Sequence, residues 1–321
     1  MLKLAMVAVP PTDERLAAIA QLGVRHLVHY DMSNHPAKFD ALSALVGRAA
    51  RFGLDVPVVE SGPPIDRIIL GLDGAAGQIA AWLVLLPRLA ENGVKVVCYN
   101  FMPQVLDDAM VVRTSEAART RGGSLTTAFR RADLPAVIDG PPPLDVKMMR
   151  RCLEDFLAIV TPVADGLGIR LAMHPDDPPM SPIAGYSRIM SSEADFDWLV
   201  STARARANGL TLCAGCLGEM RADLSGFARR HRDRIAFVHL RNMRGNPEDF
   251  METWPDDGDL DLAGLLRAMI DSGVDAYVRP DHAPRLATEP PGLTGYGFQG
   301  HVFTLGYIRG LLDAMGHKET A

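Results

Sequence analysis

The chain has 321 residues, of which 48% are hydrophobic and 22% are charged, an ordinary composition for a globular protein with a large core. Its formal net charge of -6 and the lack of a basic stripe argue against a nucleic-acid partner, and four cysteines are too few for a disulfide scaffold. A helix that crosses a bilayer needs about 20 consecutive apolar residues, and no apolar stretch of this chain is close to that length. We therefore expect a cytoplasmic protein with reduced thiols and no membrane contact.

Short apolar, β-prone runs alternate with helical patterns along the whole chain. The strand-like runs lie at residues 2–9, 25–30, 55–60, 94–101, 169–174, 209–214, 235–241 and 275–280. The helical patterns lie at residues 12–22, 38–52, 74–92, 145–166, 193–204, 222–231, 260–272 and 302–315. Several of them end at a glycine that suits a helix C-cap, namely Gly23, Gly53, Gly93, Gly168 and Gly273. Eight strand–helix pairs predict one α/β domain over residues 1–321, a (β/α)8 TIM barrel.

One segment interrupts this alternation. Residues 104–144 separate the fourth predicted strand from its helix, and a connection of this length is usually functional or disordered. At the C-terminal face of a barrel it would serve as a lid or as an oligomer arm, and we expect a homo-oligomer. The alternative fold is an open doubly wound sheet, which is less well supported because no Gly-x-Gly-x-x-Gly motif follows any predicted strand.

Four predicted strands in the C-terminal half end in side chains that can ligate a metal, namely His174, Cys213, His239 and Asp281. The C-terminal ends of the strands of a β/α barrel converge on one face, so these side chains would meet despite their separation in sequence. Taken singly, each has a simpler interpretation: a locally hydrogen-bonded histidine, a small core cysteine or a helix-capping aspartate. Four such residues in matching positions favour a site for one divalent cation.

The sequence around these four residues resembles the signature segments of the mannonate dehydratase family. The matching segments are His174-Pro-Asp-Asp-Pro-Pro, Asn208-Gly-Leu-Thr-Leu-Cys213, Phe237-Val-His239-Leu-Arg-Asn, Arg279-Pro-Asp281-His, Val59-Glu-Ser and Val94-Lys-Val-Val-Cys-Tyr-Asn-Phe-Met-Pro103. The resemblance implies a barrel related to xylose isomerases, with Mn²⁺ or Fe²⁺ held by the four candidate ligands. It also implies a dehydratase that removes water from D-mannonate to give 2-keto-3-deoxygluconate, and Tyr296 matches a tyrosine of the family.

The resemblance weakens at positions that would meet the substrate. The altered family segments are, in chain order, an Arg-Trp pair (here Met6-Val7), a His-His-Ile-Pro loop (here His29-Tyr-Asp-Met-Ser-Asn-His35-Pro), Asp-Trp-Thr-Arg-Thr (here only Arg113-Thr114) and Glu-x-x-His (here Glu252-Thr-Trp-Pro255). The metal-binding half is intact and the substrate-binding half is altered. We therefore expect a related hydroxy acid as the preferred substrate, with weak or absent turnover of D-mannonate itself.

Dehydration of a hydroxy acid removes a carbon-bound proton next to a carboxylate, which calls for a cation and for positioned acid and base groups. His282, beside Asp281, and Tyr296 are the candidates for the proton transfers, and Asp281 could leave the metal transiently. In the structural alternative, His282 only hydrogen-bonds a neighbour and Tyr296 only lines a turn. The candidate substrate-binding residues are Asn100, Arg113, Arg241, Glu252 and Arg279, although Arg279 could equally pair with Asp177 or Glu60.

The ligand set does not by itself select the metal. A Cys-His₂-Asp set accepts Zn²⁺, Fe²⁺ and Mn²⁺ alike, and the family resemblance favours Mn²⁺. Cys213-Ala-Gly-Cys216 also invites a zinc or redox interpretation, but there is no second Cys pair. We therefore treat Cys216 as incidental, although it could serve as an alternative sulfur donor. Two other functions stay open: a metal-dependent isomerase or epimerase on a polyol or keto acid, and a barrel that keeps its metal without turnover.

Overall fold

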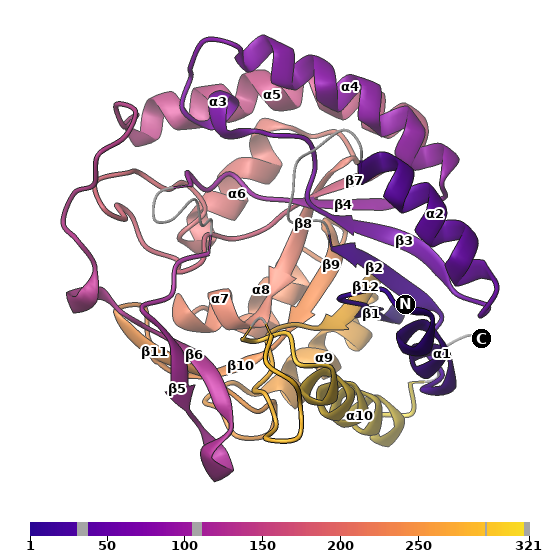
Figure 1. Cartoon of the computed structure of the whole chain (residues 1–321). Helices are drawn as coiled ribbons and strands as arrows, with labels where there is room; N and C mark the ends of the chain where they lie inside the picture. Colours follow the sequence, from indigo (N-terminus) through magenta and orange to yellow (C-terminus); the bar gives the residue numbers. More distant parts are fainter. Residues whose placement is uncertain (31–37, 105–110, 293, 318–321) are drawn as a thin grey trace.

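The computed structural model describes residues 1–30, 38–104, 111–292 and 294–317, and within them eight parallel strands close into a barrel (Figure 1). Around the barrel the strand order is β1, β12, β9, β8, β7, β4, β3, β2. The barrel strands are β1 (Leu2–Val7), β2 (His26–Tyr30), β3 (Asp55–Glu60), β4 (Val96–Tyr99), β7 (Arg170–Met173), β8 (Asn208–Cys213), β9 (Ile235–Leu240) and β12 (Ala276–Pro280). Each overlaps one of the predicted strands, which confirms the (β/α)8 barrel.

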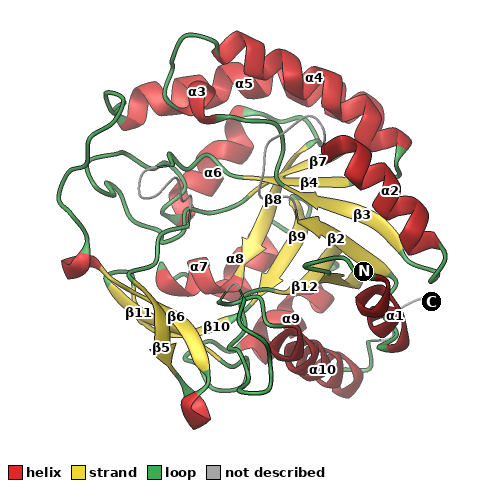
Figure 2. Ribbon diagram, in the orientation of Figure 1, coloured by secondary structure: helices red, strands yellow, loops and turns green. Residues whose placement is uncertain are grey.

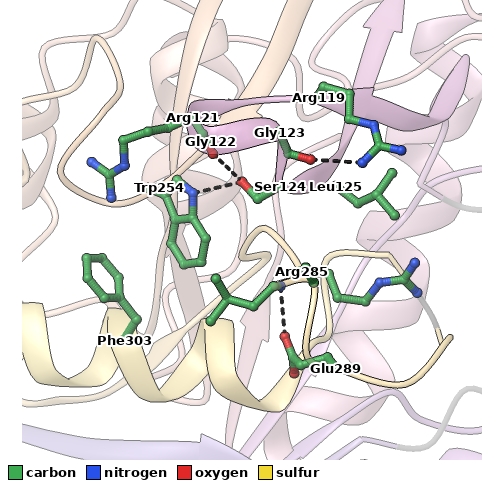
Figure 3. A pocket seen from close by; sticks show the side chains of 12 residues that line it. Arg119, Arg121, Gly122, Gly123, Ser124, Leu125, Trp254, Arg285, Glu289 and Phe303 are labelled. Atoms are coloured by element: carbon green, nitrogen blue, oxygen red, sulfur yellow. Dashed lines mark hydrogen bonds between the residues drawn. The ribbon is translucent and has the colours of Figure 1, made fainter.

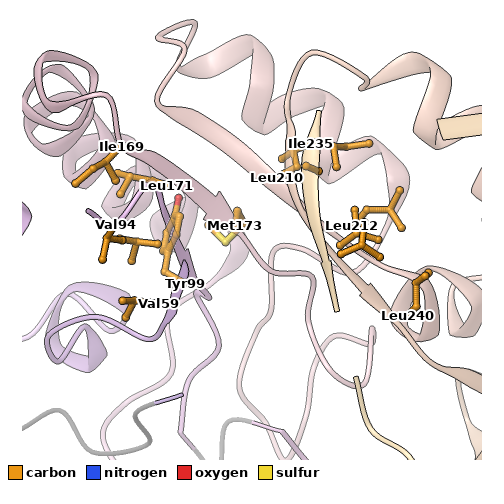
Figure 4. Packing of buried hydrophobic residues seen from close by; sticks show 14 of the residues in the cluster. Val59, Val94, Tyr99, Ile169, Leu171, Met173, Leu210, Leu212, Ile235 and Leu240 are labelled. Atoms are coloured by element: carbon orange, nitrogen blue, oxygen red, sulfur yellow. The ribbon is translucent and has the colours of Figure 1, made fainter. Parts of the chain in front are cut away.

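Both faces of the barrel strands are buried, which explains why their sequences are apolar runs and not alternating patterns. The inside of the barrel is filled mainly by small side chains, namely Ala5, Val7, Val28, Val58, Val96, Cys98, Ala172, Ala236 and Phe237. A larger cluster fills the space between strands and helices, and Figure 4 shows the part that includes Tyr99, Leu171 and Leu212. The two layers together fix the positions of the strand ends.

The helices surround the barrel on its outside (Figure 2). They are α1 (Asp13–Gln21), α2 (Lys38–Ala50), α3 (Asp66–Ile69), α4 (Ala75–Glu91), α5 (Val146–Leu167), α6 (Glu193–Thr202), α7 (Ala214–Glu219), α8 (Leu224–Arg230), α9 (Leu262–Ser272) and α10 (Phe298–Ala314). The short helices α3 and α7 are additions that the sequence periodicity does not predict. All five glycines predicted as helix C-caps have a positive φ, as that role requires. No helix in the described ranges is both long and apolar enough to span a membrane.

Part of the predicted insertion is an ordered β-hairpin. Its strands are β5 (Ser115–Arg119) and β6 (Leu125–Arg130), and the loop after β9 forms β10 (Asn242–Asn246) and β11 (Asp249–Thr253). In the described part of the chain these strands make an antiparallel sheet in the order β10, β11, β6, β5, which we call the side sheet. Because β10 follows β9 almost directly, the side sheet stands at the C-terminal mouth of the barrel (Figure 1). Residues 105–110 of the insertion lie outside the described residues, and its roles as lid or oligomer arm stay predictions.

Candidate metal centre and active site

The four predicted metal ligands meet at the C-terminal mouth of the barrel. His174 follows β7, Cys213 ends β8, His239 lies near the end of β9, and Asp281 follows β12. The Nε2 atom of His174 lies 3.2 Å from the Nδ1 atom of His239. One carboxylate oxygen of Asp281 lies 3.7 Å from that Nδ1 atom, and the other lies 3.7 Å from the Sγ atom of Cys213. Parallel strands in register thus bring together donors that are far apart in the sequence.

The outer contacts of the two histidines leave one nitrogen of each for a cation. The Nδ1 atom of His174 donates to the Pro175 carbonyl at 2.7 Å, so in the neutral ring, the form that binds a metal, its Nε2 atom carries the lone pair. The Nε2 atom of His239 donates to Glu60 at 2.7 Å, which leaves its Nδ1 atom as the acceptor. Second contacts of this kind orient metal-ligating histidines. The two histidine nitrogens and the Cys213 thiol lie close enough together to hold a divalent cation. The Asp281 carboxylate lies next to this group, beside His239 and Cys213.

The environment of Cys213 favours its ionised form. Burial opposes ionisation, but the hydrogen bond with Cys216, the charge of Arg241 and the two histidines outweigh it and hold the pKa of the thiol well below its ordinary value. The thiolate is the form of cysteine that binds metals. Cys216, whose pKa is raised by burial first and by the hydrogen bond with Cys213, stays a neutral thiol in the second layer.

Arg279 is part of the support for the ligands. Its guanidinium donates to both oxygens of Glu60, at 2.6 and 2.9 Å, and lies 3.0 Å from Asp281. Burial disfavours the Glu60 carboxylate, but the charge of Arg279 opposes it and helps to lower the pKa of Glu60 to about 2. Arg279 therefore links Asp281 to the carboxylate that orients His239, one of the two pairings that the sequence suggested for it.

Arg241 is the centre of a buried charge network. It lies 2.9 Å from Asp177, 3.1 Å from Glu219 and 3.3 Å from both Glu252 and Asp281. Gly215 makes room for it, because a Cβ atom there would lie 1.9 Å from the Nε atom of Arg241. Burial, followed by the charge of Asp177, raises the pKa of Glu219 to about 8. Nothing in the sequence marks Glu219, since it lies on a helix that the periodicity does not predict.

His282 and Tyr296 lie beside the ligand cluster. The Nδ1 atom of His282 is 2.7 Å from Glu252, and its ring centroid is 5.1 Å from that of Tyr296. Burial disfavours the charged imidazole, but the charges of Glu252 and Asp281 outweigh it and raise the pKa of His282. Burial also raises the pKa of Tyr296 well above its usual value, so its phenol stays protonated. The two groups can therefore exchange protons with a molecule in the cavity.

A cavity of about 90 Å³ joins most of these groups. Of the predicted site residues it is lined by Asn100, His174, His239, Arg241, Arg279, Asp281, His282 and Tyr296. Arg113 and Glu252 stand behind this wall, where Arg113 pairs with Glu252 at 2.7 Å and with Asp177 at 2.5 Å. The lining also includes Ser61, which belongs to a matching family segment but was given no role from the sequence. Its φ of 114° lies in the region favoured by glycine.

Comparison with solved structures shows which known proteins share this fold. A mannonate dehydratase from Streptococcus suis serotype2 aligns with a TM-score of 0.88 and 25% identity, covering 100% of this chain and 97% of that one. A xylose isomerase domain protein from Alicyclobacillus acidocaldarius aligns with a TM-score of 0.66 over 98% of this chain and 99% of that one, at 13% identity, which reflects the fold alone. The fold and the site define a β/α-barrel enzyme with xylose-isomerase-like architecture.

Sequence comparison narrows this class to one family. The family model for D-mannonate dehydratase (UxuA) matches residues 12–140 and 138–321. The mannonate dehydratase of Lactococcus lactis subsp. lactis is 31% identical, covering 94% of each chain, and that of Brucella melitensis biotype 2 is 32% identical, covering 83% of each. The chain belongs to the D-mannonate dehydratase family and is an enzyme of the hydro-lyase class. The resemblance found in the sequence is thereby confirmed.

Proposed function

We propose that the protein is a divalent-metal-dependent dehydratase that converts a sugar acid, D-mannonate or a related hydroxy acid, into a 2-keto-3-deoxy acid. The position of His282 and Tyr296 in one cavity with three of the four candidate ligands is the observation that carries this proposal. Membership of the family supports the reaction class. The donor set of two imidazoles, a thiolate and a carboxylate supports a divalent cation, for which we expect Mn²⁺.

The two proton transfers of the reaction fall to His282 and Tyr296. When bound, the cation would stabilise the negative charge that develops beside the substrate's carboxylate. His282 keeps its Nδ1 hydrogen on Glu252, so its Nε2 atom can remove the carbon-bound proton. Tyr296 keeps its phenolic proton in the buried site and can donate it to the departing hydroxyl group. Asp281 is held in place by Arg279 and Arg241, so we assign it the role of metal ligand and not that of a proton carrier.

Substrate recognition differs from the expected arginine clamp. Arg113, Arg241 and Arg279 are each bonded to buried carboxylates. The described lining of the cavity therefore combines neutral polar groups, such as Asn100 and Tyr30, with charged groups that are already paired, and it holds no guanidinium without a carboxylate partner. Met6, at the position of the altered family pair, packs in the outer layer of the core. The altered family segments support a preference for a relative of D-mannonate over D-mannonate itself; the paired arginines do not distinguish the two, because both substrates carry a carboxylate.

The pairing of these arginines with carboxylates also supports a second candidate function. An uncharged polyol or keto sugar would need no free guanidinium, so a metal-dependent isomerase or epimerase reaction fits the same cavity. The two reactions differ in their products, because only dehydration produces a 2-keto-3-deoxy acid.

An activity screen tests the proposal. The purified protein is incubated with Mn²⁺ and a panel of aldonic acids that includes D-mannonate, and 2-keto acid formation is measured. We expect one relative of D-mannonate to be converted efficiently, and kcat/KM for D-mannonate to lie below about 10⁴ M⁻¹s⁻¹, the lower end of the ordinary enzyme range. The His174→Ala/His239→Ala double variant is the matched control without a metal site.

The other outcomes are equally definite. A D-mannonate value at or above about 10⁴ M⁻¹s⁻¹ would show that the altered loops are harmless and that the substrate preference is wrong. Isomerisation of a keto sugar without 2-keto acid formation would favour the second function. A metal-loaded protein that converts none of these compounds would leave a barrel without turnover.

A further inference from the structure

We infer that Glu252 is a positioning residue for His282, and that the side sheet holds its carboxylate in place. The inference rests on the proposed function, in which His282 exchanges a proton with the substrate. Glu252 itself lies behind the cavity wall and has about 1% of its surface exposed, so it acts through His282 and not on the substrate. The long insertion at residues 104–144 would thus support a catalytic group of the active site.

Three donors from three parts of the chain fix the Glu252 carboxylate. The hydroxyl of Thr127, on β6, donates to the Oε2 atom at 2.6 Å. The Nη2 atom of Arg113, just before β5, donates to the Oε1 atom at 2.7 Å, and the Nδ1 atom of His282 lies 2.7 Å from the same oxygen. Burial opposes the ionised form, but His282 and Arg113 outweigh it and lower the pKa of Glu252 below its usual range. The carboxylate is therefore an acceptor only.

This contact selects one tautomer of His282. A carboxylate accepts hydrogen bonds, so the hydrogen of the contact belongs to the Nδ1 atom. The Nη1 atom of Arg241, which is also 3.1 Å from that Nδ1 atom, can then only lie beside it, because Nδ1 has no lone pair left to accept with. The Nε2 atom is left as the proton acceptor. An acidic group that holds an imidazole in one tautomer is the arrangement found behind the histidine of a catalytic triad.

The side sheet makes the position of Glu252 rigid. In the register between β11 and β6, Phe250 pairs with Phe129, and their rings stack with centroids 5.5 Å apart. Two residues after Glu252, the indole of Trp254 donates to the Ser124 hydroxyl at the tip of the hairpin (Figure 3). The hairpin is also joined to the loop after β12, since Leu125 and Arg285 exchange two backbone hydrogen bonds of 3.2 and 2.8 Å. That loop runs from His282 to Tyr296.

Two neighbouring threonines provide a matched test. Thr126 and Thr127 are both buried on β6, and both donate to Glu252. Thr127 reaches the side-chain carboxylate, whereas Thr126 reaches only the backbone carbonyl at 3.1 Å. Valine replaces either side chain with nearly the same shape and without the hydroxyl. Thr127→Val therefore loosens the carboxylate, and Thr126→Val is the control for loss of a buried hydroxyl on the same strand.

With the preferred substrate, we expect Thr127→Val to lower kcat about fivefold, the effect of one lost hydrogen bond, with KM unchanged. Thr126→Val should keep the kcat of the parent, and Glu252→Gln should lower it about 10²-fold. Bound metal, measured in each variant, should stay at the parental level. Equal kcat values for the two threonine variants would overturn the inference.

A second readout does not depend on turnover. In the Zn²⁺-loaded protein, the proton on the Nδ1 atom of His282 should give a low-field NMR signal, assigned by its loss in His282→Gln. Thr127→Val should move this signal and Thr126→Val should leave it in place. The inference would be overturned, even if the enzyme is active, if the parent gave no such signal or if Thr127→Val left the signal unshifted. A shifted signal in a protein without dehydratase activity would contradict the proposed function alone.

Discussion

Glu60 and Arg279 are 219 residues apart in the sequence, yet two hydrogen bonds of 2.6 and 2.9 Å join them inside the barrel mouth. The same Oε1 atom of Glu60 also accepts a hydrogen bond of 2.7 Å from His239. One ion pair therefore determines how a candidate metal ligand is oriented. All three side chains are buried, so loss of one partner would leave a charged group with little solvent contact.

Removing Arg279 should therefore destabilise the fold. Arg279→Met leaves the Glu60 carboxylate buried without its partner, a change that typically costs about 3–5 kcal/mol of unfolding free energy. Urea denaturation of the parent and the variant measures it. The Glu60→Gln/Arg279→Met double variant should recover part of the loss, and a single variant as stable as the parent would contradict the prediction.

Binding of the metal should stabilise the protein through Cys213. A ligand that binds only the native state at about 100 times its Kd adds about 2.7 kcal/mol, or roughly 4 °C in Tm for a chain of this size. We expect that rise when Mn²⁺ is added to chelator-treated protein, and almost none in Cys213→Ser. Cys152→Ser, a substitution on the outer helix α5, should respond as the parent does. A Tm of Cys213→Ser that still rises with Mn²⁺ would remove Cys213 from the ligand set.

The hydroxyl of Tyr296 should matter for rate and not for stability. Tyr296→Phe should keep the Tm and metal content of the parent and lose about 10²–10⁴ in kcat, the usual weight of a positioned acid. Tyr277→Phe is the matched control, because Tyr277 lies near the N-terminal end of β12, away from the active site, and this variant should turn over normally. Normal turnover in both variants would return Tyr296 to a structural role.

Two glycine-to-alanine substitutions should change the stability of the protein in opposite directions. At Gly215 the new Cβ atom would lie 1.9 Å from the Nε atom of Arg241, which cannot move away without breaking its carboxylate contacts. At Gly306, exposed within α10, nothing lies within 4 Å of the new atom. We expect Gly306→Ala to stabilise by about 0.5–1 kcal/mol through helix propensity, and Gly215→Ala to destabilise and to lower bound metal. Thermal unfolding with metal analysis decides both.

His301 should make the protein acid-sensitive. Burial, together with the charge of Arg279, lowers the pKa of this histidine to about 4. An unfolded histidine has a pKa of about 6.5, so between these values only the unfolded chain takes up the proton. Stability is therefore complete above about pH 6.5 and is lost as the pH falls towards 4, by about 2 kcal/mol between pH 7 and pH 5. Urea titrations at both pH values should show this loss reduced in His301→Gln, and equal losses would contradict it.

The barrel could be predicted because its strands are buried on both faces. Runs such as Ile235–Leu240, fully buried in the structure, are distinctive in any sequence window. The positions of the candidate ligands followed from the same logic, since a residue at a strand end has a known place in a barrel. The structure indeed brings His174, Cys213, His239 and Asp281 together.

The side sheet could not be predicted in this way. Its strand Ser115–Arg119 has a largely exposed, Ala- and Glu-containing sequence with low β propensity. It becomes ordered through hairpin and side-sheet pairing, and Thr127 meets Glu252 125 residues further along the chain. The second layer of the site was missed for the same reason: Thr127 and Glu219 carry no local signal and gain their contacts only in three dimensions.

The distance along the chain between the two halves of the side sheet also sets the order of assembly. During synthesis the β5–β6 hairpin leaves the ribosome long before β11 exists, so it must wait for its partner strand. Contacts between segments so distant in sequence form late in folding, after local units have been made. The barrel strands that precede β11 can therefore begin to pair while Glu252 is still missing from its place, whereas the barrel closes only when β12 pairs with β1. Turnover would then be acquired at the end of folding, which makes activity a stricter reporter of a completed chain than secondary structure is.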